Sequence, residues 1–158
     1  MLVSDKYKIV FVCIPKTGTA AVSKMIRKAD SNCYWHKSRH AIMTKEDANN
    51  FNDYFKFSIV RNSWELCASY YRFMTEKIEN ERQEPIGVAN LIQRQLVATQ
   101  NSSPFEMRES QNPFPLQLEY FSEQGDIFVD KIYKYDNGLD VEFIDLKKKL
   151  NYRCMLRS

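Results

Sequence analysis

The sequence has few of the residues that bind transition metals. It holds two histidines, and its four cysteines are widely spaced with no CxxC pair. Structural zinc sites draw four ligands from closely spaced Cys and His pairs, so we expect no metal site. Cys13 and Cys67 lie on apolar stretches, where a buried reduced thiol is the simplest interpretation. Reduced thiols are typical of a cytoplasmic protein.

Long apolar runs and a strong excess of charge are also missing. The longest apolar run near the N-terminus, residues 9–14, lies between two lysines. It is too short for a signal-peptide core or a membrane span. The net charge is +3, from 23 Lys and Arg against 20 Asp and Glu. This excess is too small to indicate non-specific nucleic-acid binding. We therefore expect no membrane partner and no nucleic-acid partner.

What is present is an ordinary globular composition with alternating strand and helix patterns. The 158 residues are 44% hydrophobic and 27% charged, which fits a single compact domain over residues 1–158. Short β-branched and aromatic runs predict strands, and apolar residues at helical spacing predict helices. The predicted strands are 7–14, 55–60 and 127–135, and the predicted helices begin near Ala20, Lys45 and Leu66 or cover residues 86–99 and 141–150. Thr44 followed by Asp47 resembles an N-cap with an acidic third position, which predicts the short helix from Lys45.

This alternation predicts an α/β fold with a parallel β-sheet flanked by helices. Lys16 and Arg61 each come directly after a predicted strand. In open parallel sheets, ligands bind beyond the carboxyl ends of the strands. The sequence therefore predicts a site where these two basic residues lie close together. Residues 101–115 contain three prolines and predict a surface loop.

Glycine is scarce, with four in the chain, and one of them is Gly18 in the segment Pro15-Lys16-Thr17-Gly18-Thr19. A glycine in a tight strand-to-helix turn lets backbone N–H groups converge on an anion, and the helix dipole assists. Lys16 and the hydroxyls of Thr17 and Thr19 supply further donors. In this loop the lysine precedes the loop's only glycine. The nucleotide-triphosphate loop GxxxxGK[ST] has two glycines and a lysine after them, so ATP or GTP hydrolysis is disfavoured. An ordinary βα turn with a capping threonine is the alternative.

A second segment, RNSWELCASYY at 61–71, places Arg61 at a strand end and Ser69 two turns into the next helix. In this order, the two segments resemble the sulfotransferase superfamily. They are most similar to the carbohydrate sulfotransferases of the heparan sulfate 2-O type and their bacterial relatives. In that family, a PKTGT loop and an RNPWxxxxSxY segment bind the donor, 3′-phosphoadenosine 5′-phosphosulfate (PAPS). Segments 117–120 and 129–136 also resemble later parts of the family.

The resemblance implies a P-loop NTPase-like sulfotransferase fold and a set of donor-binding residues. Residues 15–20 would bind the 5′ side of PAPS, and Arg61 and Ser69 would hold the 3′-phosphate. The six residues of the first group are Pro15, Lys16, Thr17, Gly18, Thr19 and Ala20. Ala20 stands where a second threonine is frequent, Ser63 replaces a proline, and Asp136 replaces a common glutamate.

The resemblance also implies the transfer of a sulfuryl group to an acceptor hydroxyl, in which Lys16 stabilises the leaving phosphate oxygen. A general base must take the acceptor proton, and histidine is well suited to this near neutral pH. His40 matches the family pattern and is preferred to His36. A carboxylate such as Glu46 or Asp47 is a further alternative.

Three functions remain open on the sequence. An active sulfotransferase with a carbohydrate acceptor is favoured by the two motifs. A catalytically silent module that binds a phosphorylated nucleotide or a partner is compatible with the short chain. A P-loop-like phosphotransferase is disfavoured by the glycine pattern.

Overall fold

The computed structural model describes residues 1–80, 116–138, 144–146 and 148. The chain divides into two compact units, Met1–Asn62 with Gln117–Ser158, and Ser63–Leu116. The prediction of one domain over residues 1–158 stays a prediction.

A five-stranded mixed sheet forms the centre of the first unit, in the order β3-β1-β2-β4-β7. The strands are β1 (Leu2–Ser4), β2 (Ile9–Val12), β3 (Tyr34–Trp35), β4 (Phe55–Val60) and β7 (Lys131–Lys134). β2 is parallel to β4, and β4 is parallel to β7, so the predicted parallel pairing is confirmed for these three strands. The sheet as a whole is not parallel, because β1 is antiparallel to both of its neighbours.

The connection between β1 and β2 explains this difference. Residues 5–8 join the two strands, and Lys8 has a φ of 51°. Four residues can close an antiparallel hairpin, whereas a parallel pair needs a long crossover. β1 has three residues and β3 has two, so neither is long enough to produce a recognisable apolar run.

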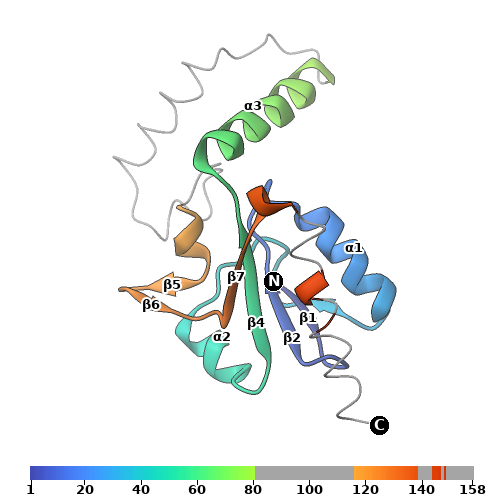
Figure 1. Cartoon of the computed structure of the whole chain (residues 1–158), viewed down its shortest axis with the longest axis vertical. Helices are drawn as coiled ribbons and strands as arrows, with labels where there is room; N and C mark the ends of the chain where they lie inside the picture. The colour runs from blue at the N-terminus through green and yellow to red at the C-terminus, as the bar shows by residue number, and fades with distance from the viewer. Residues whose placement is uncertain (81–115, 139–143, 147, 149–158) are drawn as a thin grey trace. The chain divides into compact units, whose positions relative to one another are not determined.

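The helices agree well with the predicted ones (Figure 1). α1 (Thr19–Ala29) follows the Pro15–Thr19 loop, α2 (Lys45–Asn50) precedes β4, and α3 (Ser63–Asn80) belongs to the second unit. Thr44 caps α2 through a capping box with Asp47, as the sequence pattern indicated. The predicted helix 86–99 and the predicted loop 101–115 lie outside the described residues. Of the predicted helix 141–150, residues 144–146 and 148 are described and are helical.

The predicted strand 127–135 is wrong as a single element. β5 (Ser122–Glu123) and β6 (Asp126–Ile127) form a separate two-stranded sheet, and β7 begins only at Lys131. Asp130 lies before β7, where its backbone N–H donates to the Lys56 carbonyl oxygen and its carboxylate accepts from the Lys56 N–H. The residues between β6 and β7 therefore anchor to the start of β4 instead of continuing a strand. η1 (Gln117–Tyr120) precedes β5, and η2 (Tyr135–Asn137) follows β7.

The core lies on both faces of the sheet, as the alternation along β2 requires. Ile9 and Phe11 face a cluster that includes Val22 and Ile26 of α1. Val10 and Val12 face the opposite cluster. That cluster contains Met43 and Phe51, which flank α2, together with Tyr120 and Phe121. Phe11 and Phe57 stack with their ring centroids 4.9 Å apart, so they join the two central strands.

Within the described part of the chain, no helix has the length and apolar character needed to cross a membrane.

Candidate functional site

Three parallel strands end at the same edge of the sheet, and basic residues follow two of them (Figure 1). The Pro15–Thr19 loop follows β2, Arg61 follows β4, and η2 follows β7. Because β2, β4 and β7 are parallel neighbours, their carboxyl ends are adjacent. This is the edge at which the sequence predicted the site.

The loop from Pro15 to Thr19 has the backbone shape of an anion-binding turn. Lys16 has a φ of 63° and Gly18 a φ of 83°, both in the left-handed region. Gly18 is the N-cap of α1, with no side-chain capping bond, and the first turn of α1 holds no acidic residue. The first N–H groups of a helix lack partners within the helix. The start of α1 therefore favours a negatively charged ligand.

The two loop threonines support the turn from inside. The Thr17 and Thr19 hydroxyls donate to the Ile14 carbonyl oxygen at 2.9 Å and 2.6 Å, and both residues are buried. We predicted that these hydroxyls donate to an anion. In this arrangement their protons face the Ile14 carbonyl instead, so the threonines hold the turn in shape and their hydroxyl oxygens are left as acceptors.

Arg61 joins the end of β4 to the Pro15–Thr19 loop. Its Nη1 lies 3.4 Å from the Lys16 carbonyl oxygen, which accepts a hydrogen bond from it. Its guanidinium lies over the Tyr135 ring, 4.4 Å from the centroid, in a cation–π contact. The structure thus brings Lys16 and Arg61 together, although they are 45 residues apart in the sequence.

The backbone around Arg61 is held by residues to which the sequence assigned no role. The Gln117 side chain accepts from the Arg61 N–H at 2.8 Å and donates to the Arg61 carbonyl oxygen at 2.7 Å. The Asp136 carboxylate accepts from the Asn62 N–H at 2.9 Å. Gln117 and Asp136 lie in the two later segments that resemble the family, which is the signal that could have identified them.

His40 contacts the base of the same loop. Its Nδ1 is 2.8 Å from the Cys13 carbonyl oxygen, which can only accept a hydrogen bond. Nδ1 therefore carries the proton, and Nε2 is the unprotonated nitrogen. His40 is exposed, but partial desolvation of its ring by neighbouring groups lowers its pKa below the usual value, although the bond to the Cys13 carbonyl opposes this shift. The imidazole is thus neutral near pH 7, as a general base requires.

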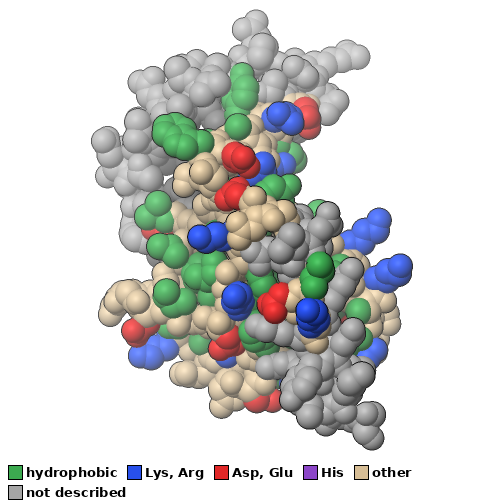
Figure 2. Space-filling view, in the orientation of Figure 1, with side chains coloured by type: hydrophobic (Ala, Val, Ile, Leu, Met, Phe, Trp, Pro, Cys, Tyr) green, Lys and Arg blue, Asp and Glu red, His purple; other side chains and the backbone are tan. Residues whose placement is uncertain are grey.

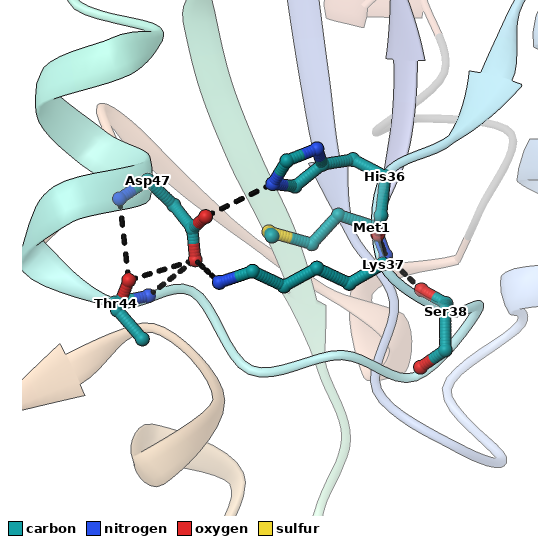
Figure 3. Close-up of polar contacts among 6 residues, drawn as sticks. All are labelled: Met1, His36, Lys37, Ser38, Thr44 and Asp47. Carbon is teal, nitrogen blue, oxygen red and sulfur yellow. Dashed lines mark hydrogen bonds and ion pairs between the residues drawn. The ribbon is translucent and has the colours of Figure 1, made fainter.

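His36 and Asp47 are engaged with each other. His36 Nε2 lies 2.9 Å from Asp47 Oδ1, and Lys37 Nζ lies 2.7 Å from Asp47 Oδ2 (Figure 3). Burial raises the pKa of the Asp47 carboxyl, but hydrogen bonds from Lys37, Thr44 and His36 outweigh it and hold the pKa at about 2. A carboxylate of such low pKa is a weak proton acceptor near neutral pH. This geometry favours His40 over both residues as the base.

The remaining predicted site residues are Ala20 and Ser69. Ala20 is exposed in the first turn of α1, beside the Pro15–Thr19 loop. Ser69 is half-buried on α3, two turns after its start, as the sequence predicted. It belongs to the second unit, so a shared role with Arg61 stays a prediction.

Basic side chains also cover the outer side of α1. Lys24, Arg27 and Lys28 are exposed there, and the space-filling view shows Lys and Arg side chains beside this helix (Figure 2).

Among the described residues, no group of three or more His, Cys, Asp or Glu side chains is arranged to hold a metal ion.

Comparisons with models of protein families, with curated proteins and with solved structures found no match to this chain.

Proposed function

We propose that this chain is a sulfotransferase that moves the sulfuryl group of PAPS to an acceptor hydroxyl. The observation that supports this most is the contact between Arg61 and the Lys16 backbone at the carboxyl edge of the sheet. These two residues come from the two segments that resemble the family. Under this proposal, the mixed α/β fold is a short form of the P-loop NTPase-like sulfotransferase fold.

The residues at this edge fit a donor that carries two phosphate groups. The uncapped start of α1 and Lys16 would hold the 5′ side, together with the backbone of the Pro15–Thr19 loop. Arg61 offers a planar fork of N–H donors suited to the 3′-phosphate. The part of Ser69 in binding the 3′-phosphate stays a prediction from the family resemblance. No described acidic residue lies in the first turn of α1, where it would oppose an anion.

The donor supplies an activated sulfuryl group. The protein's residues accept the proton of the acceptor hydroxyl and neutralise the charge on the leaving phosphate oxygen. His40 Nε2 accepts the proton of the acceptor hydroxyl as the new oxygen–sulfur bond forms. The bond from sulfur to the bridging phosphate oxygen breaks, and Lys16 neutralises the charge that grows on that oxygen. A preorganised donor of this kind contributes about 3 to 4 kcal/mol in a site from which water is excluded.

The proposal includes a carbohydrate acceptor and a cytoplasmic setting. The acceptor class rests on the family resemblance alone, since one donor site serves many acceptors. The setting is supported by free thiols at Cys13, Cys33 and Cys67. Cys13 and Cys33 are buried, as a structural thiol would be. Cys67 is exposed, which differs from the buried position that its apolar surroundings predicted.

Calorimetric titration with 3′-phosphoadenosine 5′-phosphate, the product nucleotide, tests the donor site without knowledge of the acceptor. We expect micromolar binding to the wild-type chain and at least a tenfold loss in Arg61→Ala, because a charge-assisted contact to phosphate is removed. Mg-ATP is the competitor, and we expect it to displace the product nucleotide poorly.

Arg27→Ala is the matched control. Arg27 also lies over an aromatic ring, 5.1 Å from the Trp35 centroid, but it is in the last turn of α1. Equal losses in the two variants, or a preference for Mg-ATP, would refute the proposed donor site. Nucleotide binding with no sulfate transfer to any hydroxyl acceptor would instead identify a silent binding module.

A further inference from the structure

We propose that Asp47 is a positioning residue that fixes the loop of residues 36–44 and thereby sets the place of His40. One buried carboxylate closes both ends of this loop. The chemistry assigned to His40 rests on the proposed function, but the positioning itself does not.

The Asp47 side chain is 3% exposed, and it accepts hydrogen bonds from four donor atoms. At the start of the loop, the donors are His36 Nε2 at 2.9 Å and Lys37 Nζ at 2.7 Å. At the end of the loop, the donors are the Thr44 N–H at 2.9 Å and the Thr44 hydroxyl at 2.8 Å. Figure 3 shows these side chains converging on the carboxylate from both sides.

The loop between these ends carries His40 and follows a path that its own residues do not favour. Lys37 has a φ of 59°, in the left-handed region that side chains other than glycine rarely occupy. A residue in that region persists only where its surroundings fix it. The Lys37 side chain is itself bonded to Asp47, so the carboxylate holds the loop at its strained residue.

Other contacts hold either the first part of the loop or its end. The Met1 backbone nitrogen contacts the carbonyl oxygens of His36, Ser38 and Arg39, and the Met43 N–H donates to the Tyr120 carbonyl oxygen at 2.9 Å. Asp47 alone among these residues joins the two ends. The bond from His40 Nδ1 to the Cys13 carbonyl oxygen is therefore expected to weaken when the carboxylate is lost.

The test is to measure the protonation of His40 in Asp47→Asn. The measurement is nitrogen-15 NMR of the imidazole rings in the full chain. The chain has only two histidines, so His40→Gln assigns the signals by loss. In the wild type we expect the proton on Nδ1 and a free Nε2. In Asp47→Asn we expect a mixture of tautomers and a His40 pKa closer to the usual value of about 6.5.

Glu46→Gln is the matched control, because Glu46 is the exposed neighbour of Asp47 in the first turn of α2 and the charge change is the same. We expect the wild-type His40 signals in this variant. A folded Asp47→Asn with an unchanged His40 tautomer and pKa would overturn the proposal.

If Asp47→Asn does not fold, Lys37→Met decides the matter. The Lys37 side chain is 48% exposed, so its replacement leaves the core intact. We expect a smaller change of the His40 signals in the same direction, and unchanged signals would again overturn the proposal.

Under the proposed function, kcat of Asp47→Asn falls about tenfold to a hundredfold, since misplacing a catalytic group costs that much, while binding of the product nucleotide is kept. If the wild type does not bind the product nucleotide, the proposed function is refuted, but the result on the positioning of His40 by Asp47 still holds.

Discussion

Under the proposed function, the hydrogen bonds of single ring nitrogens determine which histidine can act as the base. His36 uses Nε2 to bond Asp47, whereas His40 bonds the Cys13 carbonyl through Nδ1. The nitrogen that His40 leaves unprotonated is Nε2, which lies at the far side of the ring from the backbone contact. The sequence pattern preferred His40 on family resemblance, and the hydrogen bonds now give a physical reason for that preference.

Under the proposed function, replacing His40 by glutamine is expected to remove the acidic limb of the pH profile of sulfate transfer. A base must be deprotonated, so activity falls as the pH drops through the pKa of His40. That pKa lies below the usual 6.5, so the imidazole is mostly deprotonated near pH 7. Loss of a general base costs about a hundredfold or more in kcat.

The measurement is the rate of sulfate transfer from pH 5 to pH 8 in His40→Gln and in the control His36→Gln. The control should keep the acidic limb, although His36→Gln removes one of the four donors to Asp47. A profile that loses its acidic limb in His36→Gln and keeps it in His40→Gln would show that the base is assigned to the wrong histidine.

At the level of elements, the sequence predicted the strands and helices that have a recognisable local sequence pattern. β4 was predicted at its observed bounds, and the strand predicted over residues 7–14 contains β2 (Ile9–Val12), because their apolar runs are long enough to stand out. α2 was found through its capping box. β1 and β3 were not predicted because, at three and two residues, they are too short to leave a recognisable apolar run, and β3 forms by pairing with β1, which lies far away in the sequence.

The residues of the candidate site also differ in how far the sequence could predict them. Lys16 and Arg61 could be predicted to lie close together because each comes after a predicted strand, and parallel strands bring their ends together. Gln117 lies in a segment that resembles the family, but its contact with Arg61 could not be predicted, because the contact spans 56 residues and depends on where η1 packs. The contact of Asp47 with His36 was also not predicted, since the sequence indicated Asp47 as a capping residue and as an alternative base, and the contact arises from tertiary packing.

η1 is expected to stabilise the end of β4 through Gln117. Its amide pairs with both backbone groups of Arg61, as a neighbouring strand would. Removing two such bonds in Gln117→Ala should lower the free energy of unfolding by about 1 to 3 kcal/mol. It should also weaken binding of the product nucleotide several-fold, because Arg61 loses its fixed backbone.

Urea unfolding and nucleotide titration of Gln117→Ala test this, with Leu118→Ala as the control. Leu118 is the next residue of η1 and is 54% exposed, so its truncation removes little buried surface. If the two variants lose equal stability and bind nucleotide alike, Gln117 does not hold Arg61.

The stability of the whole molecule in acid should depend on Asp47. Its carboxyl has a pKa of about 2 in the folded protein, against 3.8 for the ordinary group. The charged form therefore stabilises the folded state by about 2 kcal/mol at neutral pH. Because the folded pKa is the lower one, this contribution is complete above about pH 5 and is mostly lost by about pH 2.

The free energies of unfolding of wild type and Asp47→Asn, from urea titrations at pH 7 and at pH 2, measure this contribution. Other carboxylates also titrate in this range, but they do so equally in both proteins, so the difference between the two proteins isolates Asp47. We expect that difference to shrink by about 2 kcal/mol on going to pH 2, while Glu46→Gln follows the wild type at both values. A difference that stays constant would mean that Asp47 stabilises the fold through its shape and not through its charge, and the loop of residues 36–44 would then owe its position to its other contacts.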